Sequence, residues 1–308
     1  STGGVGDKTT LIVASIVASL GLKVPKMSGR GLGHTGGTID KLESIPGFRV
    51  NLSREEFIQQ LNTVGVAIIS QTAHLAPLDK KVYALRDVTG TVESIPLIAS
   101  SIMSKKIASG ADKIVLDVKV GKGALLKTQE EAIEISRLMK KIGHHYQKDV
   151  DTMITYMDIP LGTSIGNALE ILEVMRILSN EENNYLVALS KALAAKMVQL
   201  GLGISIQDAA VRVEDSLASG KAYKKFMELI EAQGGDISGL RVSANTQDIL
   251  STKSGHVIDM DAYRFGKLSL DLGGGRRTKE DPIDPKVGIV LKKKIGDDVK
   301  VGDVLCTL

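Results

Sequence analysis

The chain has 308 residues, of which 43% are hydrophobic and 24% are charged; these values exclude a disordered chain and are typical of a globular protein. At about 150 residues for each domain, the length indicates about two domains. The formal net charge of +3 is spread over interleaved acidic and basic residues, which suits a small anionic substrate and excludes the basic surface of a nucleic-acid-binding protein.

The apolar segments and the cysteine content indicate a soluble protein. The longest apolar stretch, residues 11–22, is interrupted by serines and is too short to span a bilayer. Cys306 is the single cysteine and cannot form an internal disulfide, which is consistent with a reducing compartment. We therefore expect a cytoplasmic protein that contacts neither membrane nor nucleic acid.

Glycine-rich turns alternate with apolar segments of two kinds in the first part of the chain. Short segments bounded by polar residues or glycine predict buried strands at 24–27, 66–70, 113–117 and 152–156. Longer segments with helical periodicity predict helices at 9–20, 54–61, 98–108, 130–142 and 168–178. This alternation indicates an α/β domain with a mostly parallel sheet.

The remaining segments indicate two further parts. Residues 79–110 contain no strand pattern and predict two helices, broken near Thr89-Gly90 and Pro96, that form a helical insertion. Further helices are predicted at 185–200, 206–219 and 223–233, and short strands at 248–251, 256–260, 287–291 and 304–308. We therefore expect an α/β domain (1–76 and 111–238), part of a helical domain (77–110) and a C-terminal α+β domain (239–308).

Two glycine-rich segments contain residues suited to binding an anion. Residues 1–7 (STGGVGD) precede a predicted helix; the glycines allow close backbone approach, and the helix end supplies unpaired N–H groups. Residues 26–43 (KMSGRGLGHTGGTIDKLE) add hydroxyl donors at Ser28, Thr35 and Thr38. A formal G-x-G-x-x-G match lies in this second segment, but the acidic residue expected about 20 positions later falls at the start of a helix. The pattern therefore favours a phosphate site over a dinucleotide site.

Both segments closely resemble the thymidine and pyrimidine nucleoside phosphorylases, and the second segment is long and highly specific. The resemblance covers essentially the whole chain through the motifs LRDVT (85–89), SIPLI (94–98), KK (105–106), DVKVG (117–121), GNA (166–168) and GGGR (273–276). It implies a homodimer, in the full-length protein, with its site between a helical and an α/β domain. It also implies reversible phosphorolysis of uridine, thymidine or deoxyuridine to the free base and ribose or deoxyribose 1-phosphate, with inorganic phosphate as co-substrate and no organic cofactor.

The resemblance assigns the phosphate and sugar sites position by position. Phosphate would be bound by Ser1, Thr10, Ser28 and Thr38. Lys26 stands where strict thymidine phosphorylases have methionine, so its ammonium would reach a ribose 2′-hydroxyl and allow both ribose and deoxyribose.

The resemblance places the pyrimidine against Arg86, Ser101 and Lys105. A uracil ring presents two carbonyl acceptors and one N–H, so two cations and a hydroxyl complement its edge. Negative charge flows onto the ring as the glycosidic bond breaks, and cations already in place stabilise the transition state more than the substrate.

Some members of the family hold a monovalent cation, such as K⁺, near the first loop. Its matching ligands here would be the carbonyls of Gly6, Leu161 and Ser164 and the carboxylate of Glu173. The remaining ligand, a hydroxyl two residues after Gly6, is replaced by Lys8. An ammonium at this position would take the place of the ion and pair with Glu173.

The catalytic residue of the family has no match within residues 1–308. A Lys-His pair immediately precedes the serine that corresponds to Ser1, and its histidine serves as the proton donor. We therefore expect the chain to be a fragment that lacks the N-terminal helices and the extreme C-terminus and shows little activity alone. His34 lies in the second glycine-rich segment and has a side chain that can act as a base, but we interpret it as a structural residue or as one that supports the site without contacting substrate.

Other functions stay open on the sequence alone. An anthranilate phosphoribosyltransferase has a related fold and a similar loop, but it needs acidic residues for magnesium pyrophosphate and does not explain Arg86, Ser101 and Lys105 together. A non-catalytic binding protein of the same fold is the second alternative. A phosphorylase acting on nucleoside monophosphates is the third.

Overall fold

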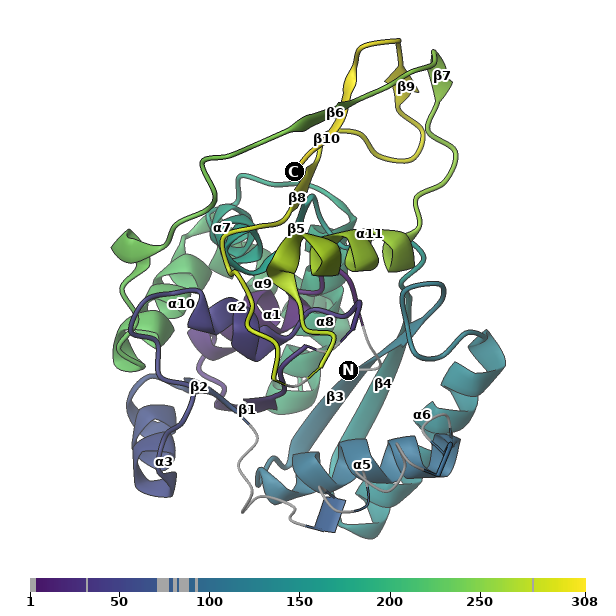
Figure 1. Cartoon of the computed structure of the whole chain (residues 1–308). Coiled ribbons are helices and arrows are strands. Elements are labelled where there is room, and N and C mark those ends of the chain that lie inside the picture. The colour runs from purple at the N-terminus through teal and green to yellow at the C-terminus, as the bar shows by residue number, and fades with distance from the viewer. Residues whose placement is uncertain are drawn as a thin grey trace.

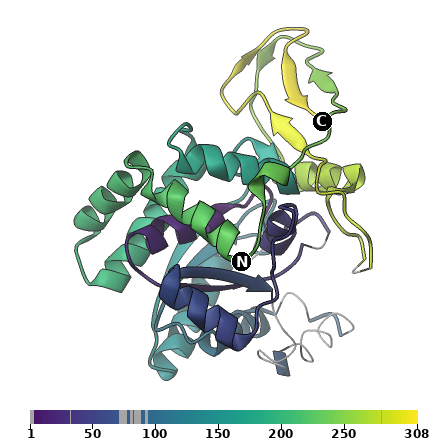
Figure 2. The same cartoon turned by 90° about the vertical axis from the view of Figure 1, so that its left-hand side faces the viewer.

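The computed structural model describes residues 4–31, 33–70, 78–79, 82, 89–91, 94–278 and 280–308. Within these residues, helices surround two short pairs of strands, and a small antiparallel sheet stands at one end (Figure 1). The turned view shows this sheet set off from the helical body, with α11 (Ala262–Ser269) at its base (Figure 2).

Strands and helices alternate through the first part of the chain and give way to consecutive helices. The alternating elements are α1 (Thr9–Ser19), β1 (Val24–Ser28), α2 (Thr38–Glu43), α3 (Arg54–Thr63), β2 (Val66–Ser70), α5 (Ile95–Ala108), β3 (Lys113–Val120), α6 (Gln129–His145), β4 (Asp149–Tyr156), β5 (Ser164–Ile165) and α7 (Asn167–Leu178). The consecutive helices are α8 (Tyr185–Leu202), α9 (Ile206–Ala218) and α10 (Lys221–Ala232). The C-terminal strands are β6 (Asp248–Leu250), β7 (Gly255–His256), β8 (Ile289–Leu291), β9 (Asp298–Val299) and β10 (Val304–Thr307).

Both strand pairs of the body are parallel. Val24 lies opposite Val66 in β1–β2, and Lys113 lies opposite Asp149 in β3–β4. Parallel neighbours need a crossover connection, which α3 and α6 provide here. The predicted α/β class with parallel strands is confirmed, although the described strands form two separate pairs rather than one continuous sheet.

Helix α1 forms the centre of the main core. Its side chains are apolar on all sides, and Leu11, Ile12 and Ile16 are completely buried. A helix of this kind is stable only when other elements surround it, and α1 contacts α8, α9 and α10. Helix α8 is long and apolar enough to cross a membrane by length and composition, but it packs against α1 and α9 as a core helix.

Helix α5 belongs to a second core on the β3–β4 pair. Ile98 and Met103 of α5 lie in one cluster with Leu116 and Val118 of β3 and with apolar residues of α6. The helix begins at Ile95, and Pro96 occupies its first turn, where a missing backbone N–H costs nothing. The predicted break at Pro96 is therefore a helix start. This packing fixes α5, which contains two of the predicted base-binding residues, against the sheet.

The C-terminal sheet is joined to the body by a strand that lies far from it in sequence. Its strand order is β5–β8–β10–β6, and β5 pairs with β8 through Ser164–Val290 and Ile165–Ile289. The strand β5 has only two residues, which is too short to show the alternation of apolar and polar residues that predicts a strand. Helices α2 and α11 were also not predicted: α2 has six residues within a glycine-rich segment, and α11 is interrupted by Gly266.

Candidate functional site

The first glycine-rich loop leads into α1 through Asp7. The Asp7 carboxylate accepts hydrogen bonds from the Thr9 backbone N–H (3.2 Å) and from Thr9 Oγ1 (2.5 Å). Asp7 therefore accepts from one of the unpaired N–H groups in the first turn of α1, which the sequence pattern predicted would bind an anion. Burial raises the pKa of Asp7, but the ammonium of Lys119 and the hydrogen bonds from Thr9 together hold it below its ordinary value. Thr10 follows and is half-buried.

The second glycine-rich loop meets the first. The Gly36 N–H donates to the Gly4 carbonyl at 3.2 Å and so joins the two loops. Ser28, the last residue of β1, and Thr38, the first residue of α2, stand at either end of the second loop. The structure therefore brings the segments of three predicted phosphate residues together, whereas Ser1 lies outside the described residues.

Lys8 occupies the predicted cation position. Its ammonium donates to the carbonyls of Leu161 (2.9 Å) and Ser164 (3.0 Å) and to Glu173 Oε2 (2.7 Å), and both charged side chains are completely buried. Burial alone would raise the pKa of Glu173; Lys8 and the N–H groups of Thr163 and Ser164 outweigh it and lower this pKa. The predicted pairing of Lys8 with Glu173 is confirmed.

The predicted base-binding residues of α5 lie one helical turn apart. The Lys105 ammonium donates to Ser101 Oγ (2.9 Å) and to the Ser101 carbonyl (3.1 Å), and it pairs with Asp79 Oδ2 at 2.8 Å. These three contacts use all three donors of the ammonium. Because Ser101 Oγ accepts from Lys105, the hydroxyl hydrogen is left to donate to another acceptor. Arg86 lies outside the described residues.

Lys26 of β1 connects the loops to α5. It lies beside Asp7 and Asp117 and against the side chain of Lys106. Burial lowers the pKa of Lys26, while the two carboxylates oppose this effect. The adjacent Lys26 ammonium, together with burial, lowers the pKa of Lys106 well below its ordinary value. A cluster of cations therefore extends from the loops to α5.

Two buried charges in this region pair with other side chains. Lys119 is completely buried and bonds to Asp117 Oδ2 (2.5 Å) and Thr155 Oγ1 (3.1 Å). Asp40 of α2 is 3% exposed and accepts from Arg276. The sequence already indicates that the charges of residues 117–119, at the end of a buried strand, anchor the sheet, because a buried charge requires a partner. The second pair joins residues too distant in sequence for any local pattern.

His34 packs within the second loop. Its ring lies 4.7 Å from that of Tyr263, and burial lowers its pKa. A cavity of about 20 Å³, the size of one water molecule, lies beside His34 and Glu170, and His34 Nε2 has no hydrogen-bond partner among the described atoms. These contacts agree with the structural interpretation.

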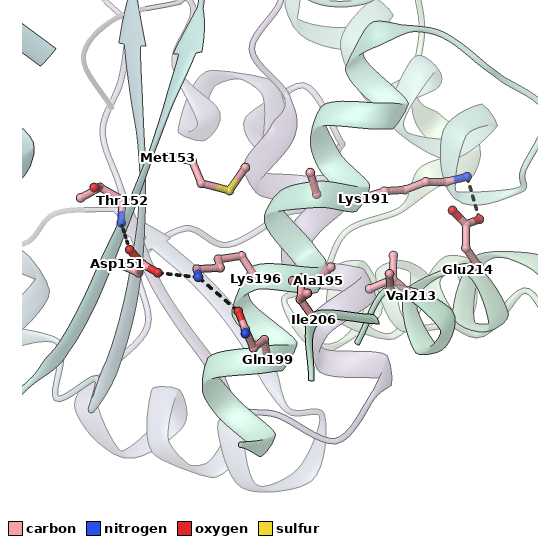
Figure 3. Close-up of a pocket in the computed structure, with 12 residues that line it drawn as sticks. Asp151, Thr152, Met153, Lys191, Ala195, Lys196, Gln199, Ile206, Val213 and Glu214 are labelled. Carbon is pink, nitrogen blue, oxygen red and sulfur yellow. Dashed lines mark hydrogen bonds and ion pairs between the residues drawn. The ribbon is translucent and has the colours of Figure 1, made fainter. Parts of the chain in front are cut away.

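A larger cavity, of about 580 Å³, lies away from the predicted residues, between β4 and helices α8 and α9 (Figure 3). Met153, Ala195 and Val213 are among the apolar side chains of its wall. The two lysines at its rim are paired, Lys191 with Glu214 (2.8 Å) and Lys196 with Asp151 (2.6 Å) (Figure 3). The size of a cavity does not by itself identify a reactive site, and both lysines in the wall of this cavity are already paired with carboxylates. We therefore take the region of the two loops and α5 as the candidate site.

Known proteins are similar to this chain over its whole length. The profile described as "Glycosyl transferase family, a/b domain" matches residues 1–223, and that described as "Pyrimidine nucleoside phosphorylase C-terminal domain" matches residues 256–308. The chain is 50% identical to the pyrimidine-nucleoside phosphorylases of Bacillus subtilis and Staphylococcus haemolyticus, over the whole chain and 73% of each relative. The anthranilate phosphoribosyltransferase of Thermus thermophilus shares the fold (TM-score 0.53, 15% identity, covering 75% of this chain and 74% of that one). The chain therefore belongs to the pyrimidine-nucleoside phosphorylase family.

Proposed function

We propose that this protein catalyses the reversible phosphorolysis of pyrimidine nucleosides, in which inorganic phosphate replaces the base and leaves ribose or deoxyribose 1-phosphate. The observation that supports it most is the junction of the two glycine-rich loops, at Gly36 and Gly4, beside a cationic cluster that reaches α5. An anion site and a site for a leaving base are needed side by side in this reaction. The fold shared with the phosphoribosyltransferase at 15% identity carries less weight than 50% identity to the phosphorylases.

Phosphate binds, in this proposal, at Ser1, Thr10, Ser28 and Thr38. The glycines between these residues let the backbone approach the anion closely. Lys26 extends from the same strand as Ser28 and contacts the sugar, so both ribose and 2′-deoxyribose are accepted.

The base binds at Arg86, Ser101 and Lys105. The Ser101 hydroxyl hydrogen is oriented away from Lys105 and donates to a ring carbonyl. Lys105 exchanges its longest contact, to the Ser101 carbonyl at 3.1 Å, for the second ring carbonyl and keeps Asp79 as its counterion. The ammonium then faces the oxygen on which charge accumulates as the glycosidic bond breaks, and it lowers the energy of the transition state.

The remaining features of the proposal concern the cation, the assembly and the compartment. Lys8 supplies the positive charge that a monovalent ion would bring to Glu173, so no added cation is required. The protein acts as a homodimer in the cytoplasm on a pyrimidine nucleoside and phosphate, without nucleic acid or membrane.

Isothermal titration with phosphate and with uracil tests the proposal. We expect both ligands to bind, and Lys105→Met to weaken uracil binding while phosphate binding stays unchanged. Lys113→Met is the matched control, because Lys113 pairs with Asp149 on the exposed surface of β3–β4. Binding of anthranilate and phosphoribosyl pyrophosphate in place of uracil and phosphate would contradict the proposal.

A further inference from the structure

A buried ion pair joins the second glycine-rich loop to the C-terminal part of the chain. Arg276 Nη1 donates to Asp40 Oδ1 at 2.7 Å, and the two side chains are 13% and 4% exposed. The other carboxylate oxygen, Asp40 Oδ2, accepts from the Gly31 N–H at 2.6 Å. One carboxylate therefore connects the Arg276 guanidinium to the backbone of the loop.

Arg276 also contacts the loop through its main chain. Its carbonyl accepts from the Gly33 N–H at 2.8 Å. The backbone of the loop therefore donates two hydrogen bonds to this ion pair. The Gly31 N–H donates to the Asp40 side chain, and the Gly33 N–H donates to the Arg276 carbonyl. The spacing is tight, because a Cβ on Gly37 would lie 2.5 Å from Asp40 Oδ2.

The segment that contains Arg276 covers the loop at a second place. It begins with α11, where a Cβ on Gly266 would lie 2.3 Å from the His34 carbonyl oxygen, and where Tyr263 packs on the His34 ring. After α11 the chain descends alongside α2, where Arg276 reaches Asp40 (Figure 1). The C-terminal segment therefore fixes the loop from outside the α/β part of the chain.

Arg30 does not duplicate this role. It approaches Asp40 Oδ1 only at 3.4 Å, its side chain is 45% exposed, and its guanidinium is engaged by Glu43. A buried arginine loses less attraction to solvent screening than an exposed one does. Arg276 is thus the principal cation of Asp40 among the described residues.

We propose that Arg276 and Asp40 are positioning residues for phosphate: the pair holds the backbone of Gly31 and Gly33 and so sets the places of Ser28 and Thr38 at the two ends of the second loop. The inference rests on the proposed function, since it concerns how that phosphate site is shaped. Neither residue touches the phosphate itself. Loss of the pair loosens the loop and weakens phosphate binding, while the base site on α5 is left intact.

The test is isothermal titration of phosphate and, separately, of uracil, with Arg276→Met, Arg276→Lys and Asp40→Asn. We expect Arg276→Met to weaken phosphate binding roughly tenfold or more, as for the loss of a charged hydrogen bond, with uracil affinity unchanged. Arg276→Lys restores part of the loss. Asp40→Asn keeps an acceptor for the Gly31 N–H but loses the charge, and its phosphate affinity falls between those of the parent and Arg276→Met.

Arg277→Met is the matched control, because Arg277 is the adjacent residue and its pair with Asp271 is exposed. Equal phosphate affinity in Arg276→Met and Arg277→Met would overturn the inference, as would an equal loss of phosphate and uracil binding, which marks a general structural role. If Arg276→Met fails to fold, the same comparison is made with Arg276→Lys and Asp40→Asn. A parent protein that binds uracil but not phosphate overturns the proposed function, and this inference with it.

Discussion

The Lys8 ammonium stands where the resemblance would place a monovalent ion. It bonds to three of the four ligands expected of a monovalent cation, the carbonyls of Leu161 and Ser164 and the carboxylate of Glu173. The fourth, the Gly6 carbonyl, accepts from the Lys8 backbone N–H at 3.0 Å. A buried carboxylate that loses its only counterion is strongly destabilising, typically by about 3–5 kcal/mol. The identity of this one residue therefore decides whether the site depends on salt.

The residue predicts a potassium response that can be measured by thermal unfolding. The parent protein should have a melting temperature that does not change as potassium is titrated. Lys8→Thr should lower the melting temperature in potassium-free buffer, and potassium should restore it, because the ion can then bind at Glu173. Strong stabilisation of the parent by potassium would contradict this account of the site.

Lys105 provides the second prediction at the residue scale. In the full-length protein, Lys105→Ala should reduce kcat/KM for uridine about 10- to 150-fold, corresponding to the loss of one charged hydrogen bond of about 1.5–3 kcal/mol in the transition state. We expect a similar reduction for Arg86→Ala, and this expectation rests only on the resemblance to the family. Circular dichroism should show unchanged helix content in both variants. A kcat/KM close to that of the parent in both would remove these residues from the base site.

At the scale of elements, local sequence patterns predicted the strands and helices whose formation depends on neighbouring residues. The strand at 66–70 was predicted with the bounds that the structure shows, because a buried apolar run between polar residues has a recognisable length. Ser101 and Lys105 could be placed together because residues four apart share a helix face. Asp40 and Arg276 could not be paired, because 236 positions separate them and only the packed chain brings them together.

The edge of β3–β4 contains a charged cluster that joins three elements. Asp151 of β4 accepts from Lys140 of α6 at 2.8 Å. It also pairs with Lys196 of α8 at 2.6 Å (Figure 3). Partial burial raises the pKa of Asp151, but the hydrogen bonds from Lys140, Lys196 and the Thr152 N–H outweigh it and lower the pKa to about 2. The carboxylate therefore stabilises the fold only in its ionised form.

This cluster predicts a pH-dependent contribution to stability. Because the folded pKa lies below the unfolded value, the contribution is complete above about pH 4 and is lost as the pH falls through about 2. Asp151→Asn should lower the free energy of unfolding by about 2 kcal/mol at pH 7 and by about half as much near pH 3, measured by urea denaturation. Asp149→Asn, at an exposed pair on the same strand, should change it by less than about 0.5 kcal/mol. A pH-independent effect of Asp151→Asn would show that the ion pairs contribute nothing.

At the scale of the whole molecule, the candidate site is assembled from segments that are distant in sequence. The two loops come from residues 1–43, α5 from residues 95–108, and Arg276 from the C-terminal part. The C-terminal sheet is joined to the body by the pairing of β5 with β8. The segment between α11 and β8, which contains Arg276, is therefore held at both of its ends. A local sequence pattern revealed each of the two loops, but only the resemblance to the family placed them with α5.

The products of nucleoside turnover test the central claim most directly. Uridine and thymidine are each incubated with the full-length protein, which contains the N-terminal segment that the resemblance implies, with and without phosphate, and free base and pentose 1-phosphate are quantified. The account predicts that base and pentose 1-phosphate form in equal amounts from both nucleosides, and only when phosphate is present. Base release without phosphate, yielding the free sugar, or a reaction that proceeds only with magnesium and phosphoribosyl pyrophosphate, would contradict it.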